Sequence, residues 1–277
     1  MKNINFAQSI NTAIIDAMSD DKKVLCMGLG TPDPKGVFGT TLGLQEKFGE
    51  QRVFDIPTSE NAITGICVGL AMDGYKPILT HQRLDFALLS LDQIINNAAK
   101  LHYMFGGVLE CPIVIRMIIG RGWGQGPTHS QNLQGLFSGI PGLRVLMPFS
   151  PQDAYSQLRA SINSPDPCIF LEHRWLHSSK SDVKQIHSKE DLIKQSLIKS
   201  GNDYTIVATS YMVAEALEAF NVLEKSYGIK GDIINFRNYD PNLLTETKTS
   251  VKKTNTLIFA DTAQSNLTIA HKISNYL

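Results

Sequence analysis

The sequence has no excess of charge and lacks the features that mark nucleic-acid-binding, membrane or secreted proteins. Its 26 Lys and Arg balance 26 Asp and Glu, and no Lys/Arg-rich run predicts a nucleic-acid surface. No apolar run approaches the roughly 20 residues that a membrane span requires. The four cysteines show no CxxC spacing, and residues 1–20 lack the apolar core of a signal peptide. We therefore expect a cytosolic protein with buried thiols and no nucleic-acid or membrane partner.

Signatures of phosphate and metal sites are missing as well. The chain contains no GxxxxGK[ST] motif and no strand-bounded GxGxxG motif, and the Gly28-Leu29-Gly30 string after an expected strand is an incomplete version of the latter. The histidines show no HExxH spacing. The sequence therefore contains no sign of a phosphate site of its own.

What is present is an alternation of short apolar runs with helical periodicity. The expected strands are 24–27, 52–56, 77–80, 112–119, 168–172, 204–209, 231–236 and 256–260. The expected helices begin at the amino terminus and cover 60–73, 87–103, 150–163, 212–227 and 267–277. This alternation predicts an α/β fold in which parallel sheets lie between helices in three layers. A polar stretch divides the pattern, so we expect domains at 1–177 and 203–277 joined by a linker at 178–202.

Glu60 is the first candidate for chemistry. It begins an apolar helix directly after an expected strand, and ligand sites in open α/β sheets lie beyond the carboxyl ends of strands. An apolar neighbourhood would keep part of such a carboxyl group protonated near neutral pH. The alternative is an acid at the start of a helix, where it interacts with the helix dipole.

His129 is the second candidate. It lies in a glycine-rich loop, residues 120–131, that follows an expected buried strand. Glycine-rich loops bring backbone close to a ligand, and a histidine there is placed for acid–base work. The alternative is a turn-rich surface loop in which the histidine has no role.

Several strings of the chain, in the same order, resemble the beta subunit of the 2-oxoacid dehydrogenase decarboxylases of the pyruvate and branched-chain types. They are 47–60 (KFGEQRVFDIPTSE), 91–100 (LDQIINNAAK), 112–116 (PIVIR), 129–131 (HSQ), 141–148 (PGLRVLMP) and 165–172 (PDPCIFLE). The resemblance implies a thiamine-diphosphate pyrimidine-binding domain followed by a transketolase C-terminal-like domain. It also implies an alpha-type partner that holds the diphosphate and Mg²⁺, in an α₂β₂ assembly with its active site at the interface.

The resemblance assigns roles to individual residues. Glu60 matches the glutamate that shares a proton with the pyrimidine ring, and Phe86 matches an aromatic residue that stacks on that ring. His129 matches a histidine that handles protons on the substrate. Leu29 stands beside the pyrimidine where the family usually has an acid. Some relatives hold K⁺ with main-chain carbonyls that match Ile113, Ser161, Ile162, Ser164 and Asp166.

The chain also departs from the family pattern. His81-Gln82-Arg83-Leu84-Asp85 replaces residues that are mostly apolar or aromatic, and Arg121, Trp123 and Gln125 replace small residues before the histidine. A more polar pocket with two extra arginines indicates an anionic or hydroxylated substrate. The alternative is that both arginines face solvent or pair locally.

Three functions stay open at this point. The first is a 2-oxoacid decarboxylase or dehydrogenase subunit that passes its acyl unit to lipoamide on an acyltransferase or to another acceptor. The second is the carboxyl-terminal half of a split transketolase or carboligase that acts on sugar-type substrates, since Gly126-Pro127-Thr128-His129 also resembles a string of that family. The third is a non-catalytic beta-like subunit. The chain ends at Leu277, roughly 50 residues short of the usual family length, so we expect a shortened second domain.

Overall fold

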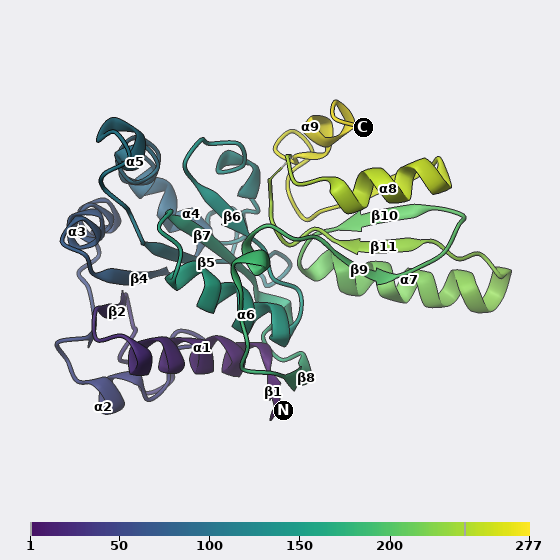
Figure 1. Ribbon diagram of the computed structural model, residues 1–277. Helices are drawn as coiled ribbons and strands as arrows, with labels where there is room; N and C mark the ends of the chain where they lie inside the picture. Colours follow the sequence, from purple (N-terminus) through teal and green to yellow (C-terminus); the bar gives the residue numbers. More distant parts are fainter. Residues whose placement is uncertain (1, 241) are drawn as a thin grey trace.

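The computed structural model describes residues 2–240 and 242–277, which form two α/β units, each built around its own main sheet (Figure 1). The larger sheet has six parallel strands. In spatial order they are β3 (Val53–Phe54), β2 (Val24–Gly28), β4 (Lys76–His81), β5 (Val114–Ile119), β7 (Cys168–His173) and β6 (Arg144–Leu146). Their near-continuous apolar sequences fit a sheet that is buried on both faces.

Alternate residues of these strands enter two different hydrophobic clusters. Cys26 of β2 and Ile78 of β4 pack in the cluster that contains α1 (Phe6–Asp20) and α6 (Pro151–Ile162). Met27 and Leu79, one position further along, pack in the cluster that contains α3 (Glu60–Met72). Because side chains alternate across a strand, this separation makes the unit a three-layer structure, as the sequence predicts.

The helix layer formed by α1 and α6 is well capped. Ser150 caps α6 by accepting from the backbone N–H of Asp153, with Pro151 at the first helical position, as expected from the sequence. The two helices are joined by polar contacts, since the Tyr155 hydroxyl donates to Asp16 at 2.7 Å and Arg159 pairs with Asp20 at 2.5 Å.

The opposite layer differs from the single helix expected over 87–103. That stretch is broken into α4 (Leu84–Ala87), a 3₁₀ turn (Leu88–Ser90), a π-helical segment (Gln93–Ala98) and α5 (Leu101–Met104). Gln93 lies against Gly65 of α3, where an added Cβ would be 3.1 Å from its side-chain oxygen. Close packing on α3 and polar side chains that bond within the segment, such as Asn97 to Gln93, accompany the wider turn.

The second unit has a four-stranded sheet between α7 (Tyr211–Tyr227) and α8 (Thr245–Thr254), with the short α9 (Ala270–Ser274) near the first unit (Figure 1). Its strands, in spatial order, are β12 (Leu257–Ala260), β10 (Thr205–Ala208), β11 (Asp232–Asn235) and β9 (Ser196–Lys199). The first three are parallel, while the edge strand β9 runs antiparallel to β11. Neither β9 nor α8 was predicted from the sequence.

The segment expected as a linker is ordered and divided between the two units. Its first part forms β8 (Lys180–Val183), which pairs antiparallel with β1 (Lys2–Asn5) beside the helices α1 and α6. A 3₁₀ turn (Lys189–Leu192) follows, and β9 then joins the second sheet. The chain therefore passes from one unit to the other between Val183 and Ser196.

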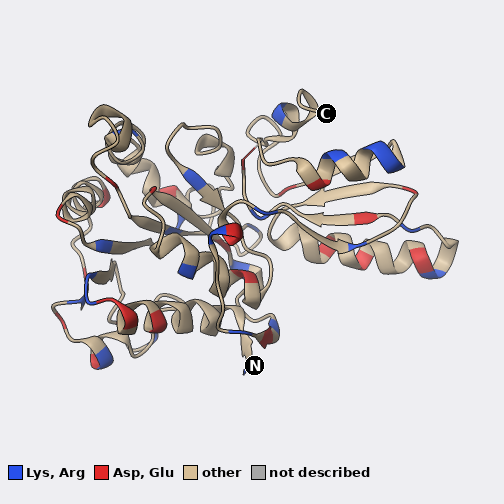
Figure 2. Cartoon of the chain, viewed as in Figure 1, with Lys and Arg blue, Asp and Glu red and all other residues tan. Residues whose placement is uncertain are grey.

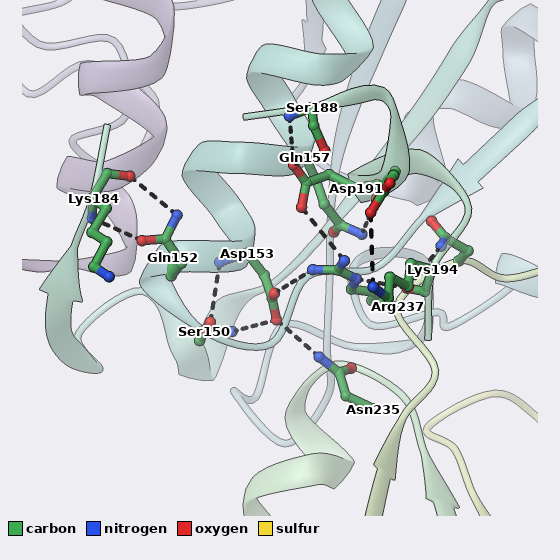
Figure 3. Close-up of polar contacts among 12 residues, drawn as sticks. Ser150, Gln152, Asp153, Gln157, Lys184, Ser188, Asp191, Lys194, Asn235 and Arg237 are labelled. Atoms are coloured by element: carbon green, nitrogen blue, oxygen red, sulfur yellow. Dashed lines mark hydrogen bonds and ion pairs between the residues drawn. The ribbon is translucent and has the colours of Figure 1, made fainter. Parts of the chain in front are cut away.

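Arg237, two residues after the end of β11, ties the two units and this passage together (Figure 3). Its guanidinium donates to Asp153 of α6 at 2.9 Å, to Asp191 at 3.4 Å and to the Lys194 carbonyl at 2.8 Å. Asn235 donates to the other oxygen of Asp153 at 2.9 Å. A planar guanidinium suits such divergent acceptors, so Arg237 fixes the second unit against α6.

Charged residues of both signs are interspersed over both units, in agreement with the zero net charge (Figure 2). Among the described residues, no helix is long and apolar enough to cross a membrane. All four cysteines are buried and free, as expected, and burial raises the pKa of each thiol, for Cys26 to about 11.

Candidate active site

The candidate site lies beyond the carboxyl ends of the first sheet, where α/β proteins bind their ligands. Leu29 follows β2, Ile56 follows β3 and Gln82 follows β4. The glycine-rich loop that leads to His129 follows β5. Because these strands are parallel neighbours, their ends meet at one edge of the sheet.

Glu60, Phe86 and Leu29, three residues named from the sequence, line one small pocket. The other residues of its wall are Ile56, Pro57, Thr58, Thr80, His81 and Gln82. Glu60 is the first residue of α3 and is half-buried, and within the described chain Ser59 before it makes no side-chain capping bond. The amino end of α3 and the pocket therefore share this carboxylate, so both interpretations of Glu60 fit its position.

His129 lies beside this pocket. It ends a short 3₁₀ turn (Pro127–His129), and its ring stands edge-on to Phe86 with ring centroids 5.4 Å apart. Its Nδ1 is 3.1 Å from the Thr128 hydroxyl. Phe86 thus contacts His129 and also lines the Glu60 pocket.

Asp85 anchors the histidine loop, a role not predicted from the sequence. One oxygen of Asp85 accepts from the backbone N–H of Gln131 at 3.3 Å and from its side-chain amide at 2.9 Å. The other carboxylate oxygen is buried and has no hydrogen-bond partner among residues 2–240 and 242–277. The sequence contains both partners, Gln131 in the HSQ string at 129–131 and the acid directly before Phe86. No sequence pattern indicates that the two are in contact.

His81 is the second residue of the site whose role was not predicted from the sequence. It ends β4, is 3% exposed, and its Nε2 lies 3.5 Å from the Thr64 hydroxyl of α3. Burial lowers the pKa of His81 to about 4, so the ring is neutral at physiological pH. The wall of the pocket therefore contains a neutral imidazole as well as a carboxylate.

The residues that depart from the family pattern differ in how far the site encloses them. Gln82 donates to the Leu29 carbonyl at 3.1 Å, and Gly30, at φ +73°, donates its N–H to Asp55 at 2.9 Å. Arg83 is buried against Trp123 and Gln125, whereas Arg121 is exposed. Of the two extra arginines, only Arg83 is therefore enclosed by the site.

The residues proposed for K⁺ lie elsewhere, around the start of β5 and the turn between α6 and β7. The Cys111 N–H donates to the Pro165 carbonyl at 3.0 Å, which brings these two segments together. The Ile113 carbonyl accepts from Cys168 and the Ser161 carbonyl from Ser164, while the Asp166 side chain pairs with Arg144. The two segments are thus adjacent in space, and K⁺ binding stays a prediction.

The side chains that line the pocket match the pyrimidine part of thiamine diphosphate in chemical type. A carboxylate suits a ring nitrogen, the face of Phe86 suits an aromatic ring, and Leu29 and Ile56 provide apolar walls. For Mg²⁺ the described residues offer no group of three or more His, Cys, Asp or Glu side chains placed to hold a metal ion. The side chains of this pocket therefore match the chemistry of one part of the cofactor, the pyrimidine ring.

Comparison with known proteins identifies the family. A model described as transketolase, pyrimidine binding domain, matches residues 2–178, and one described as transketolase, C-terminal domain, matches residues 194–277. The beta subunit of the pyruvate dehydrogenase E1 component of Staphylococcus epidermidis is 36% identical over 265 residues, which cover 95% of this chain and 81% of that protein. The mitochondrial beta subunit of Pisum sativum is 38% identical over 261 residues, 93% of this chain and 72% of that protein.

This chain belongs to the family of E1 beta subunits. The resemblance inferred from its motifs is confirmed, and so is the α/β fold with two transketolase-like domains. An inactive β₄ tetramer of a split-gene transketolase matches 99% of this chain and 85% of its own, with a TM-score of 0.79 at 18% identity. A transketolase of Campylobacter jejuni matches with a TM-score of 0.76 at 17% identity, over 98% of this chain and 41% of its own. At such identities the likeness concerns the fold alone.

Proposed function

We propose that this chain is the pyrimidine-binding half of a thiamine-diphosphate-dependent 2-oxoacid decarboxylase or dehydrogenase. The observation that carries this proposal is the convergence of Glu60, Phe86 and Leu29 on one pocket, with His129 against the ring of Phe86. Membership of the E1 beta family supports the same conclusion. An alpha-type subunit would supply the diphosphate and Mg²⁺ site, in an α₂β₂ assembly.

When bound, thiamine diphosphate supplies the electron sink that decarboxylation of a 2-oxoacid requires. Glu60 would hold a proton at its carboxyl group against a ring nitrogen of the pyrimidine, and Phe86 would offer its ring face to the same group. His129 would move a proton at its ring nitrogen to or from the substrate. Asp85 positions His129 through Gln131, two residues further along the loop.

The acyl unit would pass to lipoamide on an acyltransferase partner or to another small acceptor. K⁺, held by the carbonyls of the turn before β7, would stabilise that turn. The cytosol is the proposed location, and the four free, buried thiols support a reducing compartment.

Calorimetry of thiamine diphosphate binding tests the proposal. The complex with the co-expressed alpha-like partner should bind the cofactor in a Mg²⁺-dependent manner, while this chain alone should bind it weakly. Glu60→Gln should abolish decarboxylation of 2-oxoacids by the complex, because the carboxyl proton is lost from the pocket. Glu246→Gln, which changes a half-buried glutamate in the first turn of α8, is the matched control and should keep full activity. Failure of the purified complex to bind the cofactor would leave a non-catalytic beta-like subunit.

A split transketolase is the second candidate, and the polar wall formed by Gln82, Arg83 and Gln125 favours it. Such an enzyme would transfer a two-carbon ketol unit between sugar phosphates without releasing carbon dioxide. The same complex should therefore be assayed with a ketose phosphate donor and an aldose phosphate acceptor. Transfer without decarboxylation of any 2-oxoacid would select this candidate.

A further inference from the structure

An open cavity of about 530 Å³ lies next to the candidate active site. We call it the aromatic–arginine cavity and define it by Phe38, Arg83, Trp123, Gln125, Arg174 and Trp175. Two links join it to the site. Arg83 follows Gln82, which lines the Glu60 pocket, and the Trp123 indole N–H donates to the His129 carbonyl at 2.9 Å.

Arg83 is the charged centre of this cavity. It is 7% exposed, and its guanidinium carbon lies 4.9 Å from the Trp123 ring centroid and 5.2 Å from that of Phe38. It donates to the Gln125 side-chain oxygen at 2.6 Å, while its Nε is buried and lacks a hydrogen-bond partner in the described part of the chain. Aromatic faces stabilise a guanidinium, but they do not neutralise it.

In the part of the chain that the structure describes, no ion pair neutralises the positive charge of the cavity. The guanidinium carbon of Arg174 lies 4.8 Å from the ring centroid of Phe38, the same ring that Arg83 contacts. Burial lowers the pKa of Arg83, the charge of Asp85 opposes this shift, and the nearby Arg174 adds to it. Among residues 2–240 and 242–277, neither arginine forms an ion pair. An enclosed cation without a contacting counter-charge is costly, and an anionic ligand would relieve this cost.

Residues with positive φ angles shape the walls of the cavity. Phe38, a residue with a bulky side chain, has φ +51°, and its ring contacts both arginines from this conformation. Gly120, at φ +140°, lets Trp123 fold back, since an added Cβ would lie 2.6 Å from that ring. Gly122, at φ +81°, leaves the same kind of room for Trp175. Strained backbone and glycines therefore build the cavity walls.

We propose that the aromatic–arginine cavity binds a distal anionic group of the substrate, a carboxylate or a phosphate ester, while the reacting carbonyl lies at the Glu60–Phe86–His129 site. This inference rests on the proposed function and defines its substrate class. The guanidinium of Arg83 would bind the anion, with Arg174 as the second cation. The ring of Trp123 would contact the part of the substrate between the anion and the carbonyl.

The position of the tryptophans provides a direct binding assay. The chain has two tryptophans, and both line this cavity, so the indole fluorescence of the full chain reports on it. Titration with inorganic phosphate, and separately with succinate, should change this fluorescence in a saturable manner. A response to phosphate alone or to succinate alone would support the proposal and identify the anionic group, and no response to either would overturn it.

Substitutions then separate a built site from general electrostatic attraction. Arg83→Gln should weaken anion binding at least tenfold, and Arg83→Lys should recover only part of it, because lysine keeps the charge but not the planar fork. Arg121→Gln is the matched control, since it removes the same charge from an exposed position on the loop that carries Trp123. Equal losses for Arg83→Gln and Arg121→Gln would overturn the proposal. If Arg83→Gln does not fold, Arg174→Gln replaces it with the same expectation.

Activity of the complex with its alpha-like partner completes the test. Oxaloacetate or 3-phosphohydroxypyruvate, which carry a second anionic group, should be preferred to pyruvate. Arg83→Gln should lower kcat/KM for the preferred substrate about tenfold through KM, with a much smaller loss for pyruvate, so that the preference disappears. Decarboxylation of pyruvate without any anion response would refute the cavity assignment and leave the proposed function intact. Anion binding without thiamine-diphosphate-dependent chemistry would refute the proposed function and leave only an anion site in the cavity.

Discussion

The buried histidine at the end of β4 should make the stability of the chain depend on pH. Burial lowers the pKa of His81 in the folded state to about 4, whereas an unfolded chain has a histidine pKa near its ordinary value of 6.5. Above pH 6.5 the ring is largely neutral in both states. As pH falls, the unfolded state takes up a proton that the folded state refuses, so the free energy of unfolding decreases.

The magnitude follows from these two pKa values. The loss attributable to His81 is about 1.3 kcal/mol at pH 5.5 and about 2.5 kcal/mol at pH 4.5, relative to pH 7.5. His81→Gln should lack this contribution. Its free energy of unfolding should therefore approach that of the wild type, or exceed it, as the pH falls.

Urea unfolding of the wild type and His81→Gln at pH 7.5, 6.5, 5.5 and 4.5 measures the effect. Other titrating groups cancel in the difference between the two proteins, provided that the substitution leaves their surroundings intact. His102→Gln changes an exposed histidine and serves as the control for the loss of an imidazole outside the core. A constant difference for His81→Gln would refute the reasoning, because His81 would then be protonated equally in both states.

Three further substitutions test a close contact between the units, the helix propensity of α3 and the ion pair of Arg237. Gly135→Ala should destabilise the chain by about 2 kcal/mol in the same urea assay, because the new Cβ would lie 1.5 Å from the Leu267 carbonyl oxygen. Gly69→Ala, in α3 with no described atom within 4 Å of the new Cβ, should instead stabilise it by about 0.5–1 kcal/mol. Arg237→Met should cost about 3 kcal/mol, since Asp153 loses its buried ion-pair partner, and limited proteolysis should then cut faster within residues 184–195. Unchanged cleavage there would contradict the role given to Arg237.

The parts of the fold that depend on local apolar patterns were predictable from the sequence. The strands β2, β3, β4, β5 and β7 of the first sheet lie close to their expected ranges, as do α3, α6 and α7, because each has a strong apolar pattern and clear boundaries. The sixth strand, β6, was not predicted, because it is only three residues long. The strands β1, β8 and β9 were missed because their largely polar or exposed residues gain their order from a partner strand far away in the chain. The break in the helix over 87–103 depends on packing against α3, which local patterns do not contain.

The candidate site was predicted in its members but not in its connections. Glu60, Phe86, Leu29 and His129 were named from motifs, and three of them share a pocket. His81 was set aside as part of an apolar run, and its burial became evident only from the packing of β4. The contact of Arg83 with Trp123 joins loops that are far apart in the chain, and no local pattern indicates it.

One hydrophobic cluster runs without interruption from the first sheet into the second. It begins with residues such as Leu79 and Ile115, passes through Met147 after β6, and continues to Phe236 and Ile273. A core shared in this way couples the unfolding of the two units, because neither can expose its part of the cluster without affecting the other. The two sheets are therefore expected to move together, and any local motion at the candidate site would fall to its loops, such as the glycine-rich segment before His129.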